Sequence, residues 1–188
     1  MTRMPQDEVQ GMSLSIEIDI VNGEASRPRA EELFGAAALA EPDKPSWDHI
    51  KWASADLRVL IEADDGTLVC HAGVFFRSAT WNGQKVHIGG VGAIVTRPDC
   101  RRRGYAGIAL GAAVQTMRDH DAAQFALLFC EPRLFEFYQS RGWRPFTGDI
   151  YVEQAAARVR FEAMAPFVFD LKRRAPERGT LDLCGPPW

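Results

Sequence analysis

Residues 94–107 read IVTRPDCRRRGYAG, and this stretch decides the fold that we expect. An apolar run ends at Thr96, an arginine-rich turn follows, and small residues after Tyr105 are typical of a helix start. The predicted order is therefore strand, loop and helix N-terminus. Unpaired amides and the positive end of the helix dipole favour a bound phosphate group at such a place.

The composition of the loop adds to this expectation. Gly104 and Ala106 lack bulk, so the main chain can approach a ligand closely. Arg101, Arg102 and Arg103 supply charges that pair well with phosphates. Taken alone, the pattern is equally typical of a phosphate-binding loop and of a solvated strand-to-helix connection, because short glycine patterns often match by chance.

Before this loop, alternating apolar residues predict further strands. Residues 14–20 predict a half-buried first strand, and 30–39 are rich in helix formers. Residues 41–47 contain two prolines and predict a loop, after which Trp47, Asp48 and His49 are expected to begin a short helix.

Two turn signals organise the next region into a meander of three antiparallel strands. Asp65-Gly66 separates the alternating residues 57–63 from the apolar run 68–76. Asn82-Gly83 is the second turn, and it leads into a strand over residues 86–96.

After the loop, Leu110, Val114 and Met117 have helical spacing. The continuous apolar run 125–130 predicts a strand buried on both faces. The alternation of helices and strands places the chain in the α/β class, of the α+β type, with a mixed central sheet of roughly six to seven strands.

The remaining part of the chain gives weaker signals. Residues 134–141 predict another helix, which Gly142 ends at a C-cap position. Strands are expected near Tyr151 and over 167–171.

Length and composition indicate one soluble globular domain. The chain has 188 residues, 46% of them hydrophobic and 25% charged. We expect a loose tail over residues 1–11 and a single domain over 12–188. A net charge of −3 argues against nucleic acid and membrane as partners and suits a cationic one. No secretory or membrane-spanning pattern is visible, so the expected location is the cytoplasm.

The cysteines and histidines do not predict a metal site. They lack the close pairs and the HExxH spacing that zinc sites use. These residues are Cys70, Cys100, Cys130, Cys184, His49, His71, His87 and His120.

Residues 98–106 resemble the cofactor motif of the GNAT N-acetyltransferase superfamily. In that motif Arg or Gln precedes two variable residues, Gly, one residue, and Gly or Ala, which matches Arg101, Gly104 and Ala106. Residues 137–143, FYQSRGW, are similar to the second signature of the superfamily. The resemblance implies the GNAT fold, with a sheet that splays where acetyl-CoA binds as co-substrate.

The resemblance also implies roles for individual residues. Main-chain groups of Ile94, Val95 and Thr96 would hold pantetheine, and the loop from Arg101 through Tyr105 to Gly107 would hold the phosphates. Tyr138 would protonate the departing thiolate, since a tyrosine is protonated at neutral pH. The alternative for Tyr138 is an aromatic core residue among other aromatic side chains.

From residue 47 to its last residue, the chain also resembles aminoglycoside 2'-N-acetyltransferases. The similarity includes residues 47–49, 71–74, 91–106 and 138–143, together with the final segment. It implies that Glu41, Trp47 and Trp188 contact an acceptor amine, with the ring and free carboxylate of Trp188 facing it.

Three positions depart from that family. Its catalytic glutamate falls on Gly92, and two further acidic positions fall on Ser46 and Pro186. Losing these carboxylates should weaken the binding of a polycationic drug. A smaller or less charged amine is therefore the alternative acceptor.

The missing glutamate leaves the general base open. Glu131, after the strand 125–130, and His87, on the strand before the loop, are the candidates. The alternatives are that Glu131 caps the next helix, that His87 is an ordinary strand residue, and that water removes the proton.

The resulting hypothesis is an acetyl-CoA-dependent N-acetyltransferase that acts on a small, cationic amine of the aminoglycoside or amino-sugar type. Acetylation of a protein or peptide and transfer of a longer acyl chain are alternatives within enzymes. A catalytically silent acyl-CoA-binding module, suggested by Gly89, Gly90 and Gly92, is the alternative outside enzymes. A homodimer agrees with the resemblance, because GNAT proteins often pair.

Overall fold

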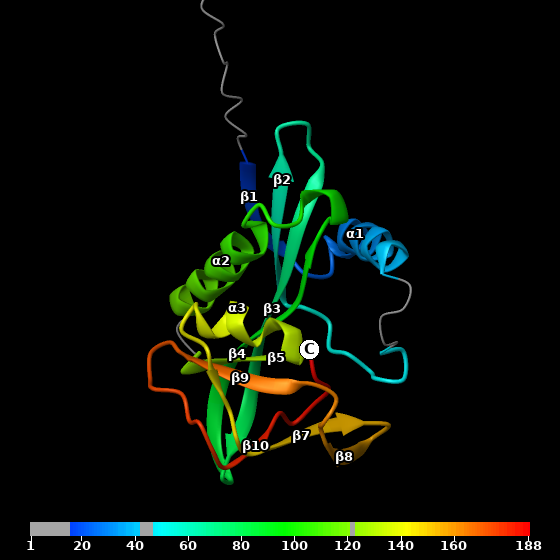
Figure 1. Cartoon of the computed structure of the whole chain (residues 1–188). Coiled ribbons are helices and arrows are strands. Elements are labelled where there is room, and N and C mark those ends of the chain that lie inside the picture. The colour runs from blue at the N-terminus through cyan, green and yellow to red at the C-terminus, as the bar shows by residue number, and fades with distance from the viewer. Residues whose placement is uncertain (1–15, 42–46, 121–122) are drawn as a thin grey trace, which may run out of the picture.

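The computed structural model describes residues 16–41, 47–120 and 123–188. Within them, ten strands form one mixed sheet accompanied by three α-helices, which confirms the predicted α+β class (Figure 1). The predicted N-terminal tail, Leu14 and Ser46 lie outside the described residues.

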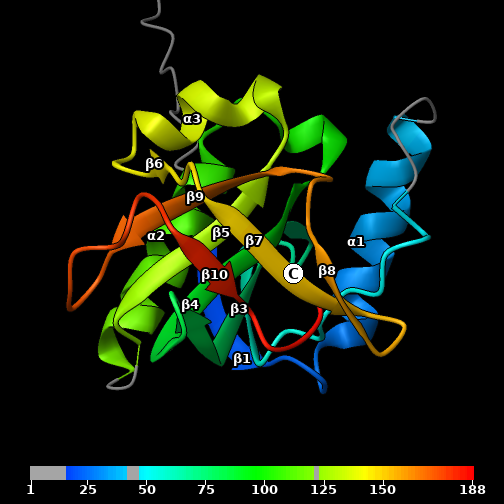
Figure 2. The ribbon, with the colours of Figure 1, turned by 90° about the horizontal axis from the view of Figure 1, so that it is seen from below.

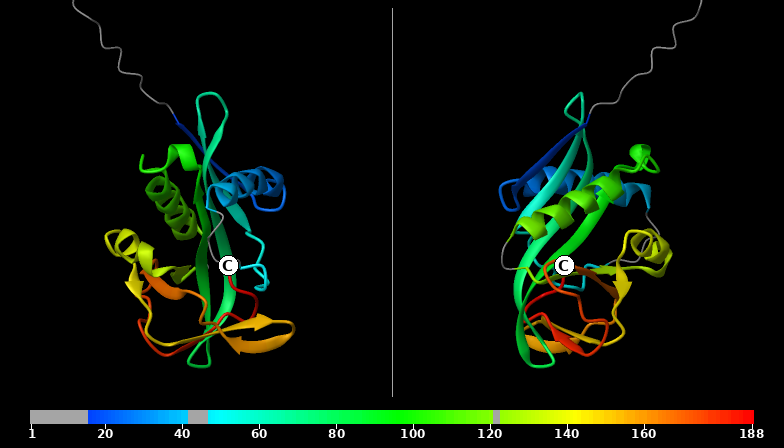
Figure 3. Two further views of the ribbon diagram at one scale, coloured as in Figure 1. Left: turned by 45° about the vertical axis from the view of Figure 1, so that its right-hand side comes forward. Right: turned by 90° about the vertical axis from the view of Figure 1, so that its left-hand side faces the viewer.

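A four-stranded antiparallel region forms the first half of the sheet, and β2 to β4 make the predicted meander. These strands are β1 (Ile16–Asn22), β2 (Leu57–Ala63), β3 (Leu68–Trp81) and β4 (Gln84–Thr96). Helices α1 (Arg27–Ala40) and α2 (Tyr105–Asp119) cover opposite faces of this region (Figure 3). Phe34 of α1 meets the ring of His71 on one face, whereas the neighbouring Cys70 packs in a cluster with α2 on the other.

Strand β4 carries a bulge shortly before its end. His71 pairs with Val95, but two residues later Gly73 pairs with Gly92, so β4 holds one residue more than β3 over this interval. Ala93, in the extra stretch, has a φ of +49°. The bulge therefore changes the direction of the last residues of β4.

The centre of the sheet opens between β4 and β5 (Phe125–Cys130). The two strands are parallel and pair from Ile88 with Phe125 to Val91 with Leu128. Beyond this point β4 continues beside β3, while β5 stays paired with β9 (Ala165–Asp170) along its other edge. As predicted, all six residues of β5 are buried.

The last part of the chain extends the sheet beyond the predicted number of strands. Strand β10 pairs with both β3 and β7, and β7 and β10 lie across the lower side of the molecule (Figure 2). The three strands that the sequence did not predict have two to four residues each: β6 (Arg144–Pro145), β8 (Ala157–Arg160) and β10 (Thr180–Asp182). Such short strands give no periodic signal, and every residue of β8 is exposed. Strand β7 (Asp149–Gln154) was expected near Tyr151.

Two hydrophobic cores lie on opposite faces of the sheet. The first packs α2 and Tyr138 against Val59, Val91 and Leu128. The second joins the other faces of β3, β4 and β5 to the C-terminal part, with Trp188 among its buried residues. The final residues are therefore an integral part of the folded domain.

Two helix predictions need correction. Trp47–Ile50 forms a hydrogen-bonded turn, from the amide of Ile50 to the carbonyl of Trp47, and no helix begins there. The helix predicted over 134–141 is shorter: a 3₁₀ turn (Pro132–Leu134) precedes α3 (Phe135–Gln139). Gly142, with a φ of +84°, follows its end as expected. None of the described helices is long and apolar enough to cross a membrane.

Candidate active site

The loop between β4 and α2 presents unpaired main-chain amides. A short 3₁₀ turn (Pro98–Cys100) is followed by Gly104, which caps α2 with a φ of +89°. Among the described residues, the amides of residues 102–106 donate to no main-chain or side-chain acceptor, whereas Gly107 donates to the carbonyl of Gly104 at 2.9 Å. A run of free donors at a helix start is suited to an anion.

The arginines of the loop have separate surroundings. The guanidinium of Arg101 forms an ion pair with Glu41, the residue after α1, and its Nε lies 3.4 Å from the carbonyl oxygen of Thr96. Arg103 donates to the carbonyl of Asp99 at 3.3 Å, and Arg102 has a φ of +62°. The ring of Tyr105 is buried in the first core, so only its amide remains available to a ligand.

The end of β4 turns alternate main-chain groups toward the opening in the sheet. Val95 pairs with His71, and the amide of Arg97 donates to Val69 at 2.9 Å, so both use the β3 edge. Because a strand alternates its main-chain groups between its two edges, those of Ile94 and Thr96 face the other way. Of the three residues predicted to hold pantetheine, Ile94 and Thr96 thus turn main-chain groups toward the opening, and Val95 turns its own toward β3.

Tyr138 lies in α3 and is 6% exposed. Its ring packs against Phe137, Trp143 and Phe167, as the core interpretation expects. Among the described residues, the Tyr138 hydroxyl has no hydrogen-bond partner. Every fully buried side-chain nitrogen or oxygen of these residues does have a partner, so this hydroxyl is not fully buried. The hydroxyl therefore reaches accessible space. Burial, followed by the neighbouring Cys130, raises its pKa, which keeps the proton on the phenol.

The start of α2 and the end of α3 meet at one point. A Cβ added to Gly107 would lie 3.1 Å from Nη2 of Arg141. This guanidinium is held by the carbonyl of Phe137 at 2.8 Å and lies 4.0 Å from the centre of that ring. Arg141 thus brings a positive charge to the free amides, while its own amide bonds the carbonyl of Tyr138 at 3.0 Å. Sequence analysis missed Arg141, and its position within FYQSRGW was the available signal.

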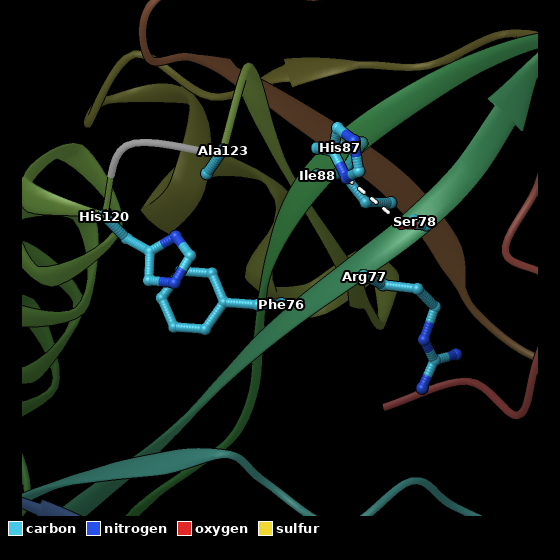
Figure 4. A pocket seen from close by; sticks show the side chains of 7 residues that line it. All are labelled: Phe76, Arg77, Ser78, His87, Ile88, His120 and Ala123. Atoms are coloured by element: carbon cyan, nitrogen blue, oxygen red, sulfur yellow. Dashed lines mark hydrogen bonds between the residues drawn. The ribbon is translucent and has the colours of Figure 1, made fainter.

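The two base candidates have different positions. Glu131 directly follows β5, beyond the last β4–β5 pair, and its carboxylate is bound by Nε of Arg133 at 2.6 Å. His87 is exposed near the other end of β4 and meets Ser78 at 3.1 Å. It lines a surface pocket of about 200 Å³ with Phe76, whose ring stacks on His120 at 3.9 Å (Figure 4).

That pocket is remote from the loop. His120 follows the last residue of α2, and Gly104 precedes the first. A helix of 15 residues is about 22 Å long. The structure therefore leaves His87 away from Tyr138 and from the free amides.

Trp188 closes the opening from the second core. Its ring stacks on Phe75 at 5.4 Å, and its Nε1 donates to the carbonyl of Leu127 in β5 at 3.3 Å. A Cβ at Gly90 would lie 2.3 Å from the ring, and one at Gly92 would lie 3.0 Å from the main-chain carbonyl carbon of Trp188. Trp188 is 5% exposed and its ring packs in the second core, so contact of the ring with a substrate stays a prediction. Its main chain remains beside β4.

The other acceptor candidates lie apart from Trp188. Glu41 is engaged with Arg101, and the ring of Trp47 lies 6.4 Å from that of His49. The guanidinium of Arg77 covers the Trp188 ring at 5.1 Å and donates to the carbonyl of Pro186. A cation thus lies beside Pro186, the position at which the resemblance implies an acidic residue.

The described residues contain no group of three or more His, Cys, Asp or Glu side chains that could hold a metal ion.

Residues 24–146 match the family described as Acetyltransferase (GNAT) domain. An aminoglycoside 2'-N-acetyltransferase of Mycolicibacterium fortuitum is 33% identical over 135 residues, which cover 72% of this chain and 66% of that protein. The chain thus spans slightly less than two thirds of this relative's length.

Solved structures agree on the fold. A protein from Lactobacillus plantarum described as a putative N-acetyltransferase has a TM-score of 0.60 at 18% identity, and the match covers 84% of this chain and 99% of that one. A GNAT family acetyltransferase from Brucella melitensis in complex with acetyl-CoA has a TM-score of 0.59 at 13% identity, with coverage of 89% and 94%. YhbS from Escherichia coli in complex with CoA has a TM-score of 0.58 at 13% identity, with coverage of 91% and 89%.

Proposed function

Because the chain belongs to the GNAT acetyltransferase family and is therefore an acyltransferase, we propose that it transfers an acetyl group from acetyl-CoA to the primary amine of a small cationic molecule. The observation that carries this proposal is the run of free amides at residues 102–106, beside the opening between β4 and β5.

The residues at the opening fit an acyl-CoA. The free amides and the dipole of α2 would hold the pyrophosphate, with Arg101, Arg102, Arg103 and Arg141 adding charge. The main-chain groups of Ile94 and Thr96 would bind the amides of pantetheine as an additional strand would. The Lactobacillus, Brucella and Escherichia structures share this fold, and the latter two are complexes with acetyl-CoA and CoA.

The chemistry that acetyl-CoA supplies is an acetyl group activated as a thioester. Tyr138 donates its hydroxyl proton to the sulfur as the carbon–sulfur bond breaks. Its raised pKa keeps the phenol protonated, and the accessible hydroxyl leaves it able to donate. Main-chain amides along the opening stabilise the negative charge on the reacting carbonyl oxygen.

The acceptor amine must lose protons before and after it attacks the carbonyl carbon. Glu131 stays a candidate for this role at the open end of β5, although Arg133 competes for its carboxylate. Water that enters the opening is the simpler acceptor for the proton. His87 has no part in this proposal because of its distance from the opening.

The acceptor is proposed to be an amino-sugar-like amine that carries fewer charges than an aminoglycoside. The relative that is 33% identical is named as an aminoglycoside acetyltransferase, which favours an amino sugar. The charge of Glu41 beside the loop is offset by its ion pair with Arg101, whereas Arg77 beside Trp188 repels a cation. A polycation would meet this repulsion, and a monoamine would be able to avoid it.

The test is thiol release from acetyl-CoA, measured with an amine panel that includes aminoglycosides, glucosamine-type sugars, monoamines and peptide amines. We expect the highest kcat/KM for a small amino sugar. Preference for a peptide amine would contradict the acceptor assignment. No turnover with any amine, despite CoA binding by calorimetry, would make the protein a binding module.

A further inference from the structure

A buried polar chain connects the bulge of β4 with the opposite edge of the sheet. His71 Nδ1 lies 2.8 Å from the carbonyl oxygen of Ala93, and His71 Nε2 lies 2.9 Å from Nη1 of Arg58. Arg58 Nε in turn donates to the carbonyl of Gly23 at 2.8 Å. His71 is 0% exposed and Arg58 is 7% exposed, so water does not replace these contacts.

The partners fix the tautomer of His71. A carbonyl oxygen can only accept and a guanidinium can only donate, so the proton must sit on Nδ1 while Nε2 accepts. This assignment requires a neutral ring. Burial lowers the pKa of His71 to about 4, opposed by the bond to Ala93 and aided by the charge of Arg58, which agrees with a neutral ring at neutral pH.

Ala93 is an unusual acceptor for this bond. Its φ of +49° is a conformation that side chains other than glycine seldom adopt, and it costs free energy unless the surroundings hold it. The Ala93 side chain is exposed, so no packing of its methyl group explains the conformation. The bond from His71 is a contact that does hold it.

The residues directly after Ala93 are those that turn toward the opening. The bulge adds one residue to β4 after Val91. Because of this extra residue, the main-chain groups of Ile94 and Thr96 face the opening. A flattened bulge would reverse which residues face β3 and which face the opening.

We propose that His71 is a positioning residue for the acyl-CoA site: its Nδ1–H holds the Ala93 bulge, which directs Ile94 and Thr96 toward the cofactor. This inference rests on the proposed function, since it assigns the way in which the same site is shaped. The competing interpretation is a buried histidine that serves stability alone.

Two substitutions separate these interpretations. In His71→Asn the side-chain amide nitrogen occupies the place of Nδ1, so the bond to Ala93 is kept and the partner of Arg58 is lost. In His71→Gln the longer side chain reaches the place of Nε2, so Arg58 keeps its partner and Ala93 loses its donor. Each variant leaves one buried polar group without a partner, so both should lower the melting temperature similarly.

The experiment measures the Kd of CoA by calorimetry on both variants and on the unaltered protein. We expect His71→Gln to weaken CoA binding about tenfold and His71→Asn to stay within about threefold, because only the first frees the bulge. Equal Kd values for the two variants, or a greater loss for His71→Asn, would overturn the proposal. Failure of the unaltered protein to bind CoA would instead refute the proposed function.

A second pair keeps the proposal testable if either variant does not fold. Ala93→Val places a β-branched residue where φ is positive, whereas Ala93→Gly relieves the conformation at the same exposed site. We expect only Ala93→Val to weaken CoA binding. Unchanged affinity in Ala93→Val would show that the bulge does not shape the site.

The tautomer can be read without any ligand. Nitrogen NMR of the imidazole should show protonated Nδ1 and unprotonated Nε2 at neutral pH. The opposite tautomer would remove the donor to Ala93 and with it the proposal.

Discussion

The two sides of the opening between β4 and β5 are built in different ways. The cofactor side consists of main-chain amides from one short segment, residues 102–106, at the start of α2. The proposed acceptor side depends on residues from separate segments: Glu41 after α1 pairs with Arg101, while Arg77 in β3 packs on Trp188 at the end of the chain. The cofactor side therefore depends on the conformation of one loop, whereas the acceptor side depends on packing between segments that are distant in the sequence.

The largest effect is expected from Gly104→Glu on the cofactor side. Glycine is required at a φ of +89°, and a carboxylate there would repel the phosphates that the free amides attract. CoA binding should fall by more than about 100-fold in calorimetry. Gly111→Glu is the control, because it adds the same charge on the same helix at an open position. Normal affinity in a folded Gly104→Glu protein would refute the phosphate site.

Trp188→Ala should affect the acceptor side through stability. Removing a buried tryptophan costs about 3–5 kcal/mol of the free energy of unfolding, which corresponds to a melting temperature lower by roughly 6–20 °C. In the protein that remains folded, the Kd of CoA should change little. A melting temperature within about 2 °C of the original would show that the buried ring contributes little.

The contact between Trp188 and Gly90 offers a double-mutant test of this packing. Gly90→Ala should cost about 1–3 kcal/mol alone, because its Cβ would meet the ring, but much less when combined with Trp188→Ala. If the losses in the free energy of unfolding of the two single variants add up in the double variant, the Gly90 Cβ position and the Trp188 ring are not in contact.

Tyr138→Phe should separate binding from chemistry. The ring and its aromatic contacts stay, while the proton donor is lost, so the Kd of CoA should remain and kcat should fall about 100-fold. Steady-state kinetics with the best amine measures this. A normal kcat would make Tyr138 a core residue only.

His71 predicts a pH dependence of stability. Its folded pKa of about 4 lies below the unfolded value, so the unfolded chain takes up a proton as the pH falls below about 6.5 while the folded chain does not. Stability is therefore lost as the pH falls toward 4. The groups around the ring are Arg58 from β2, the Ala93 carbonyl from β4 and the Phe34 ring from α1.

Urea titrations at pH 7 and pH 5 measure this loss. The unaltered protein should lose about 2 kcal/mol more than His71→Asn over this interval. Equal losses would indicate that His71 is protonated in the folded state.

The smallest effect is expected where the two sides touch, at the ion pair between Arg101 and Glu41. Both side chains keep about a third of their exposure, 39% and 32%, so solvent screens the pair. Glu41→Gln should change the Kd of CoA by less than about fivefold, because exposed pairs contribute at most about 1 kcal/mol. A tenfold or larger change would mean that the pair controls access to the loop.

The contrast between a local loop and the packing of distant segments also explains which elements the sequence could predict. The loop, α2, the meander β2–β4 and β5 follow from local signals such as Gly104, Asn82-Gly83 and the apolar run of β5. The short strands β6, β8 and β10 exist only because neighbouring strands supply their hydrogen bonds, so their own residues give no pattern.

The acceptor side was less predictable for a related reason. The burial of the Trp188 ring depends on Gly90 and Phe75, and the engagement of Glu41 depends on Arg101. Each of these pairs is remote in sequence, and no local period reports it. The same holds for the bond from His71 to Ala93, which joins two strands across a bulge.

The docking of Trp188 also has a consequence for the order of folding. Arg77 and Pro186, which form a hydrogen bond, are separated by 109 residues, so closing this loop costs more entropy than forming the β3–β4 hairpin. The meander with α2 is expected to become structured early, leaving the glycine-lined face of β4 open to water until the last segment arrives. Pulsed hydrogen exchange during refolding should therefore protect the amides of β3 and β4 near Asn82-Gly83 before the Trp188 indole N–H. Simultaneous protection would indicate that both cores form in one step.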